Sequence, residues 1–275
     1  MVRKTSILIV AIWCIKMQAG YAQSTRDTTA MVKEFNKVMS FALQPYLYYT
    51  TLTRMDALPV LEARDTASTY GIFYKNETNL YYKNGQDEIY LQDSLLVQIN
   101  DDQKTIWIRK VDMSTRDKLN VSPLENKKIQ ELFRKDYSID KSIVDANKTR
   151  MNFEAKQPVN SGADITTQIG LEYQSANYQP LLMDMQIKMQ EPASDELLAA
   201  LRTEGIDDAR LIRVIDGNKY IIRKQRVSIS FSGIDTSKEK AMQMPDWKAK
   251  LQYNESNGEF AGKGAYSEYE ITKTF

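Results

Sequence analysis

The 275-residue chain contains no histidine, and its single cysteine, Cys14, lies within the first 22 residues. If those residues are removed on export, the mature chain has neither residue type. Thiolate nucleophiles, imidazole general bases, disulfides and the usual zinc ligands are then all excluded. We therefore expect no cofactor and no metal site, and we expect that the protein is not an enzyme.

An excess of charge of one sign is also missing. Thirty-seven basic residues nearly balance 36 acidic ones, which gives a formal net charge of +1. Removal of residues 1–22 takes away three basic residues and no acid, so the formal charge would become −2. A nearly neutral protein has little long-range attraction for polyanions, and nucleic acid is therefore not expected as a partner.

The apolar stretch near the start of the chain is too short to span a bilayer. Arg3 and Lys4 precede the apolar residues 7–15, and Gly20-Tyr21-Ala22 supplies the small residues that a signal peptidase reads. A transmembrane helix needs roughly 20 apolar residues. We predict a signal peptide over residues 1–22 with cleavage near Gln23, a periplasmic or secreted protein, and no permanent transmembrane segment.

Helical periodicity occurs in three places. Apolar residues recur at spacings of three and four over residues 27–43, a pattern that ends before Pro45 and predicts an amphipathic helix: Met31, Phe35, Val38, Met39 and Ala42. A capping box at Ser122 to Glu125 predicts a second helix to about Lys135. A short third helix is predicted over residues 194–202.

Strand signals dominate the remaining sequence. The Asn84-Gly85 pair predicts a hairpin, because both residues tolerate positive φ. The predicted strands are 46–52, 70–74, 80–83, 88–91, 94–99, 105–111, 149–155, 165–173, 181–189, 210–215, 219–224, 227–231, 250–253 and 266–272. Residues 56–65 are predicted to form a connection.

No repeat or linker divides residues 23–275, so we predict one domain of the α+β class. Its architecture is expected to be a single large curved antiparallel sheet, an unclosed β-barrel of about ten or more strands, with two or three helices packed on the concave side. Ile106 and Ile108 alternate with Trp107, so both faces of that strand are expected to meet apolar groups.

The strand of methionines is the sequence feature with the most functional content. Methionine is unbranched and polarisable, so a methionine surface adapts to ligands of varied shape. Candidate ligand-binding residues are therefore Tyr48, Trp107, Met183, Met185, Ile187 and Met189. The same alternation is also typical of ordinary core residues beneath a helix, and the tyrosines near residue 48 are also ordinary strand residues.

Carboxylates are the remaining candidates for catalysis. Asp101-Asp102 and Asp207-Asp208 are adjacent acids. Neighbouring side chains point apart on a strand, so neither pair forms a two-carboxylate site by itself, and turn or solvent positions explain both pairs.

Two segments resemble a known family. The sequence GIFYKNETNLYY from Gly71 to Tyr82, followed by LVQINDDQKTIWI from Leu96 to Ile108, resembles the periplasmic lipoprotein carrier superfamily typified by the lipoprotein chaperone LolA. The resemblance implies an exported, unclosed β-barrel, lidded by helices, that holds acyl chains in an apolar cavity.

Three functions follow as hypotheses. The leading one is a periplasmic binding or carrier protein for a lipid, a lipoprotein acyl chain or another apolar ligand, with residues 30–43 and 123–135 as the lid. The second is a scaffold or interaction domain of the cell envelope, with a filled core and an exposed apolar patch that holds another protein. The third is a carboxylate-dependent hydrolase, which needs two acids roughly 5 to 10 Å apart.

Overall fold

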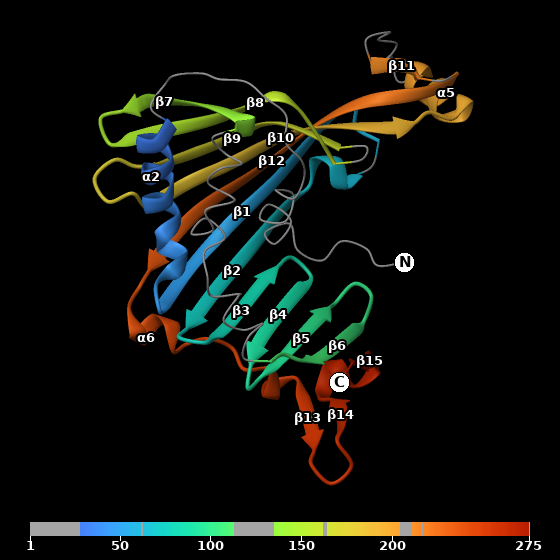
Figure 1. Ribbon diagram of the computed structural model, residues 1–275. Helices are drawn as coiled ribbons and strands as arrows, with labels where there is room; N and C mark the ends of the chain where they lie inside the picture. Colours follow the sequence, from blue (N-terminus) through green and yellow to red (C-terminus); the bar gives the residue numbers. More distant parts are fainter. Residues whose placement is uncertain are drawn as a thin grey trace.

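The computed structural model describes residues 28–61, 63–112, 135–161, 164–203, 211–215 and 217–274. Within them, thirteen strands form one large sheet, which bends strongly and does not close (Figure 1). The predicted curved, unclosed sheet is thus confirmed. The predicted signal peptide and the predicted second helix lie outside the described residues.

The first part of the chain forms a helix and a meander. The helix α2 spans Thr28–Met39 and continues as the 3₁₀ turn η1, Ser40–Leu43. A further 3₁₀ turn, η2, spans Ala63–Thr66. The strands are β1 (Tyr46–Leu58), β2 (Ser68–Asn76), β3 (Asn79–Asn84), β4 (Asp87–Gln92), β5 (Leu95–Asn100) and β6 (Thr105–Lys110).

The sequence predicted this meander closely, but β1 is longer than expected. Residues 56–58 were predicted to lie in a connection, whereas they pair with β12 at residues 224–226. The partner strand therefore extends β1 where its own sequence gives only a weak signal. Gly85, at a φ of +59°, forms the predicted turn between β3 and β4.

Long strands form the second half of the sheet: β7 (Tyr137–Asp145), β8 (Lys148–Ser161), β9 (Asp164–Gln174), β10 (Pro180–Pro192), β11 (Ile212–Ile215) and β12 (Asn218–Asp235). The segments predicted as strands at 219–224 and 227–231 are one 18-residue strand. β7 was not predicted, because this edge strand exposes most of its side chains and shows no alternation.

The chain returns to the first half of the sheet at its C-terminal end. The residues from 236 onward form α6 (Lys238–Ala241), η5 (Trp247–Ala249), β13 (Leu251–Asn254), β14 (Glu259–Gly262), η6 (Gly264–Glu268) and β15 (Glu270–Thr274). We call residues 236–274 the C-terminal segment. β15 pairs with β6 in parallel, so the sheet is mixed and not purely antiparallel as predicted.

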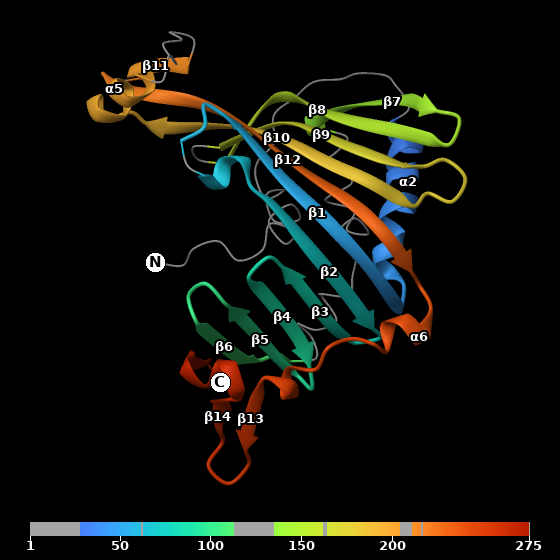
Figure 2. The same ribbon diagram turned by 180° about the vertical axis from the view of Figure 1, so that it is seen from behind.

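The order of strands is β15-β6-β5-β4-β3-β2-β1-β12-β10-β9-β8-β7, and β11 pairs with β12. The central pair, β1 and β12, therefore joins two halves that lie far apart in the sequence (Figures 1 and 2). The helix α5, Asp195–Thr203, packs with Leu61, Ile212 and Ile221 at the far end of β12. Two or three helices were predicted on the concave side of the sheet, and among the described helices only α2 lies there.

Candidate functional site

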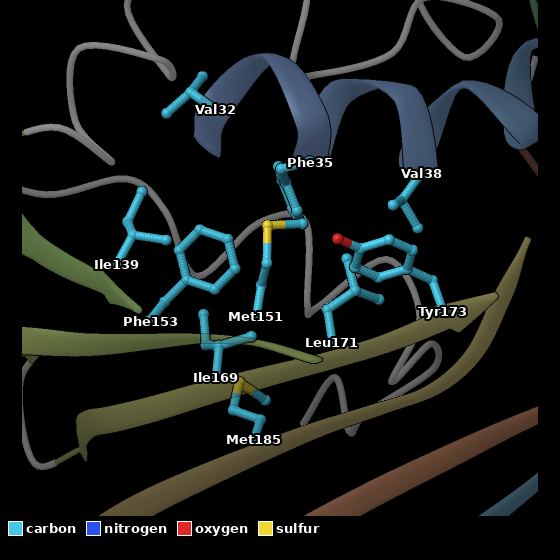
Figure 3. Close-up of a cluster of buried hydrophobic side chains, with 10 residues drawn as sticks. All are labelled: Val32, Phe35, Val38, Ile139, Met151, Phe153, Ile169, Leu171, Tyr173 and Met185. Atoms are coloured by element: carbon cyan, nitrogen blue, oxygen red, sulfur yellow. The ribbon is translucent and has the colours of Figure 1, made fainter. Parts of the chain in front are cut away.

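The two faces of the sheet have different covers. We call the face that contacts α2 the inner face, and the face that contacts the C-terminal segment the outer face. α2 packs on β7 to β10 (Figure 3) through a buried cluster: Val32, Phe35, Val38, Ile139, Met151, Phe153, Ile169, Leu171, Tyr173 and Met185. The ring centroids of Phe35 and Phe153 are 4.9 Å apart, edge to face.

A polar anchor accompanies this apolar contact. Glu34 of α2 accepts hydrogen bonds from the hydroxyl of Tyr173 at 2.7 Å and from Nζ of Lys141 at 2.7 Å. Burial by itself would raise the pKa of Glu34, but the hydrogen bonds from Lys141 and Tyr173 outweigh it and lower that pKa. The helix is therefore fixed to strands β7 and β9.

Aromatic side chains continue the inner face across the centre of the sheet. Tyr49 stacks on Phe73, with centroids 4.7 Å apart. Phe41 of η1 meets the edge of Tyr49 at 5.7 Å and the edge of Phe231 at 5.9 Å. Burial raises the pKa of Tyr49, so the Tyr49 hydroxyl stays neutral over the physiological range.

Two rows of side chains cross the first half of the sheet on this face. Strand register aligns one residue from each of β1 to β6 in what we call the aromatic row: Tyr49, Phe73, Tyr82, Ile89, Gln98 and Trp107. The adjacent leucine row contains Leu47, Lys75, Leu80, Leu91, Leu96 and Arg109. The inner face is thus broad and mainly apolar, and half of the side chains in the two rows are buried: Leu47, Tyr49, Lys75, Tyr82, Ile89 and Leu91.

Exposure changes along the aromatic row. Tyr82 and Ile89 are buried, whereas Trp107 at the β6 end is 51% exposed. Burial, with a smaller contribution from the charge of Asp87, raises the pKa of Tyr82 to about 12. The row therefore runs from a buried aromatic centre to a tryptophan that solvent reaches.

The structure brings most of the predicted ligand-binding residues to the inner face. Trp107 lies in the aromatic row, and Met183 and Met185 pair with Ile229 and Val227 of β12. Met185 belongs to the packing under α2, and Met183 and Ile187 lie partly buried against it, as the alternative core interpretation expects. Met189 of β10 pairs with Arg223 of β12, and the Met189 side chain lies outside the described part of the structure.

Tyr48 lies on the outer face, because it precedes Tyr49 by one residue on β1. Its ring packs against Tyr74 at 4.8 Å, and Nζ of Lys240 in α6 lies 4.4 Å from the ring centre. The structure therefore separates Tyr48 from the other candidates. Strand alternation indicated that Tyr48 and Tyr49 face opposite ways, but only the position of α2 identifies which face is inside.

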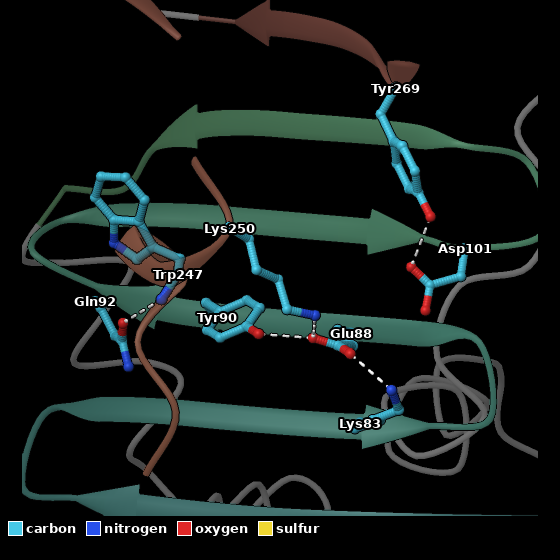
Figure 4. Close-up of polar contacts among 8 residues, drawn as sticks. All are labelled: Lys83, Glu88, Tyr90, Gln92, Asp101, Trp247, Lys250 and Tyr269. Atoms are coloured by element: carbon cyan, nitrogen blue, oxygen red, sulfur yellow. Dashed lines mark hydrogen bonds and ion pairs between the residues drawn. The ribbon is translucent and has the colours of Figure 1, made fainter. Parts of the chain in front are cut away.

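The outer face contains a buried ion-pair network that the sequence analysis missed (Figure 4). Glu88, 2% exposed, accepts hydrogen bonds from Lys83 at 2.7 Å, from Lys250 at 2.5 Å and from the Tyr90 hydroxyl at 2.6 Å. Backbone N–H of Trp247 donates to Gln92 at 3.4 Å. These contacts fix the C-terminal segment to strands β3 and β4.

Two pairs of adjacent acids were candidates for catalysis. Asp101 accepts a hydrogen bond from the Tyr269 hydroxyl at 3.2 Å (Figure 4), and Asp207-Asp208 lies outside the described residues. Among the described side chains, no group of three or more Cys, Asp or Glu residues is arranged to hold a metal ion. None of the helices described here is long and apolar enough to cross a membrane.

No family model and no curated protein matches this sequence. One similar solved structure is a DUF1329 family protein from Desulfovibrio piger, 9% identical, with 86% of this chain and 100% of that chain covered and a TM-score of 0.34. Another is a LolA superfamily protein from Nitrosomonas europaea, 10% identical, with 73% and 92% covered and a TM-score of 0.19.

These TM-scores are low, so the fold class rests on the sheet itself. A curved, unclosed sheet with a helix on its inner face is the architecture that the sequence resemblance to the LolA superfamily implies.

Proposed function

We propose that this protein is an exported, non-enzymatic carrier that holds a lipid or another apolar ligand against the inner face of its sheet. The observation that supports the proposal most is the extent of the apolar inner face. It continues from the cluster under α2, through Tyr49 and Phe73, to Trp107 at the far side of the meander. Burial of an acyl chain on such a surface gains about 0.8 kcal/mol for each methylene group.

The location of the protein is part of the proposal. The order of Arg3-Lys4, an apolar stretch and Gly20-Tyr21-Ala22 favours export, which places the mature chain in the periplasm or outside the cell. A carrier there would move a poorly soluble molecule through water between membranes. The low net charge and the absence of histidine agree with a function in binding and not in catalysis.

Tryptophan fluorescence can test this proposal directly. The chain has three tryptophans, of which Trp13 lies in the predicted signal peptide. Trp107 lies on the inner face, whereas Trp247 is 3% exposed and belongs to a buried apolar cluster on the outer face that includes Tyr90 and Phe260. A bromine-labelled fatty acid bound on the inner face should therefore quench the fluorescence of Trp107 and leave the fluorescence of Trp247 unchanged.

The matched proteins for this test are Trp247→Phe, which retains Trp107, and Trp107→Phe, which retains Trp247. We expect saturable quenching in the first protein and none in the second. Organic extraction and mass spectrometry of the protein, purified after export without detergent, should also recover lipid. Equal quenching of both proteins, or no quenching together with no extracted lipid, would rule out the carrier.

A second candidate, an interaction domain of the cell envelope, is favoured by the exposed apolar side chains of the edge strand β7. β7 is the last strand in the order, and its residues Ile143 and Val144 are 79% and 49% exposed. An exposed edge strand with apolar side chains can pair with a strand of another protein. In that case a specific protein should co-purify with the wild type and not with Ile143→Lys, and lipid extraction should yield nothing.

A further inference from the structure

Lys75 is a buried cation on the inner face. Lys75 is 6% exposed, although lysine is almost never buried without a partner. In the leucine row its neighbours are Leu47 on β1 and Leu80 on β3. Phe73, which stacks on Tyr49, lies two residues earlier on the same strand and therefore on the same face.

The ammonium group of Lys75 has few partners. Nζ donates one hydrogen bond, 3.2 Å long, to the backbone carbonyl of Ala42 in η1. An ammonium group has three N–H donors, so two remain for other acceptors. No carboxylate in the described part of the chain forms an ion pair with Lys75, whereas Lys83, the exposed Lys141 and the more buried Lys250 each pair with one.

Such an arrangement favours the binding of an anion supplied from outside. Burial lowers the pKa of Lys75, because the charged form loses hydration and no neighbouring carboxylate compensates. A buried charge without a counterion is costly, and an acidic group that reached Nζ would remove that cost. The carbonyl of Ala42 follows Phe41 directly, so the ammonium group lies beside the aromatic residues at the centre of the inner face.

We propose that Lys75 binds the acidic head group of an amphiphilic ligand whose apolar chain lies along the aromatic row. This inference rests on the proposed carrier function and narrows its ligand to amphiphiles with a carboxylate or phosphate head. A charge-assisted hydrogen bond from Nζ to the acid oxygen would fix the head near Phe73 and Ala42. The chain would then extend toward Tyr82 and Trp107.

Four ligands separate the contribution of the acidic head group from that of the apolar chain. Hexadecanoate and hexadecyl phosphate have an acidic head and a C16 chain, hexadecanol has the chain without the charge, and inorganic phosphate has the charge without the chain. We expect the two acidic amphiphiles to bind wild-type protein at least about tenfold more tightly than the alcohol, the usual effect of a hydrogen bond to a charged group. Inorganic phosphate alone should bind weakly or not at all.

Substitution of the lysine tests its role. Lys75→Met keeps a long apolar side chain and should bring the acid-to-alcohol affinity ratio to about one, while hexadecanol binding remains. Lys75→Arg should preserve the ratio. Lys33→Met, which removes an exposed cation of α2, is the matched control and should also leave it unchanged.

The outcomes distinguish this inference from the carrier function. Binding of hexadecanol as tight as that of hexadecanoate by the wild-type protein would overturn the role of Lys75 and leave the carrier intact. This comparison requires no variant, so it remains decisive even if Lys75→Met does not fold. An unchanged ratio in a folded Lys75→Met protein would overturn it as well. Binding of none of the C16 ligands would contradict the carrier proposal itself.

Discussion

The guanidinium group of Arg150 on β8 crosses over β9 to reach the carboxylate of Asp184 on β10, with Nη2 2.7 Å from Oδ2. The residue of β9 beneath this ion pair is Gly170, which pairs with both strands at this level. A Cβ atom at Gly170 would collide with Nη2 of Arg150 and come within 2.5 Å of Oδ1 of Asp184. The absence of a side chain at residue 170 thus lets the ion pair form on the outer face.

Gly170→Ala is therefore expected to destabilise the protein by about 3 kcal/mol, because it displaces Arg150 and leaves the 3%-exposed Asp184 with only Arg226 as its partner. The free energy of unfolding in urea measures this change. In a double-mutant cycle, Arg150→Ala should reduce the cost of Gly170→Ala, since no guanidinium remains to be displaced and only the close approach to Oδ1 of Asp184 is left. Strict additivity of the two substitutions would contradict this account.

Glu88 should contribute stability that depends on pH. Burial by itself would raise the pKa of Glu88, but hydrogen bonds from Lys250, Lys83 and Tyr90 outweigh it and hold that pKa below its ordinary value. A carboxylate whose pKa is lower in the folded state stabilises the protein above its unfolded pKa, and this contribution is lost as the pH falls through the folded pKa. Glu88→Gln should lower the free energy of unfolding at neutral pH by roughly 3 kcal/mol.

The comparison between pH 7 and about pH 3 tests the cause of this effect, since an unperturbed glutamate has a pKa of about 4.3. The difference in unfolding free energy between wild type and Glu88→Gln should narrow in acid, because the unfolded chain binds a proton at this carboxylate at a higher pH than the folded protein, where the pKa is lowered. A gap that stays constant over this range would mean that packing, and not charge, accounts for the loss. Glu259→Gln is a suitable control, because the Glu259 side chain is 60% exposed in its pair with Lys273.

The attachment of α2 depends on apolar burial. Phe35, 6% exposed, contacts Phe153 in the cluster between helix and sheet. Phe35→Ala is expected to lower the free energy of unfolding by about 3 to 4 kcal/mol, through lost burial and the cavity that remains. Lys33→Ala on the exposed side of α2 should change it by less than about 0.5 kcal/mol. Similar losses for the two variants would show that helix propensity, and not this cluster, holds α2 in place.

Several tyrosines should resist ionisation. Burial raises the pKa of Tyr82 to about 12, and it also raises the pKa values of Tyr49 and Tyr90. A tyrosine in an unfolded chain ionises near pH 10. Because the folded-state pKa is higher, the stabilising effect is complete below about pH 10 and is lost as the pH rises toward 12. Tyrosinate absorbance should therefore rise in two stages, the second together with unfolding measured by circular dichroism.

A single titration stage, complete before any loss of secondary structure, would contradict the burial of these hydroxyl groups. Tyr82→Phe provides an internal check. It removes one group from the second stage and leaves the amplitude of the first stage unchanged.

The amino-acid sequence alone determined the local elements. Alternation of apolar and polar residues placed β2 to β6 and β10, and helical spacing placed α2, because both patterns have short periods that neighbouring residues define. The resemblance of residues 71–108 to a known superfamily also pointed to the unclosed sheet. These signals were sufficient to predict that Met183 and Met185 share one face of a strand.

Only the tertiary structure decided which faces meet and which charges are buried. The pairing of β1 with β12, and that of β15 with β6, joins segments far apart in the chain, and no local period encodes such contacts. Tyr48 lies outside because α2 covers the opposite face. Lys75 becomes a buried cation only in the folded chain, where Leu47 and Leu80 are its partners in the strand register and the carbonyl of Ala42 accepts its hydrogen bond, and the cost of burying a charge depends on such neighbours in space.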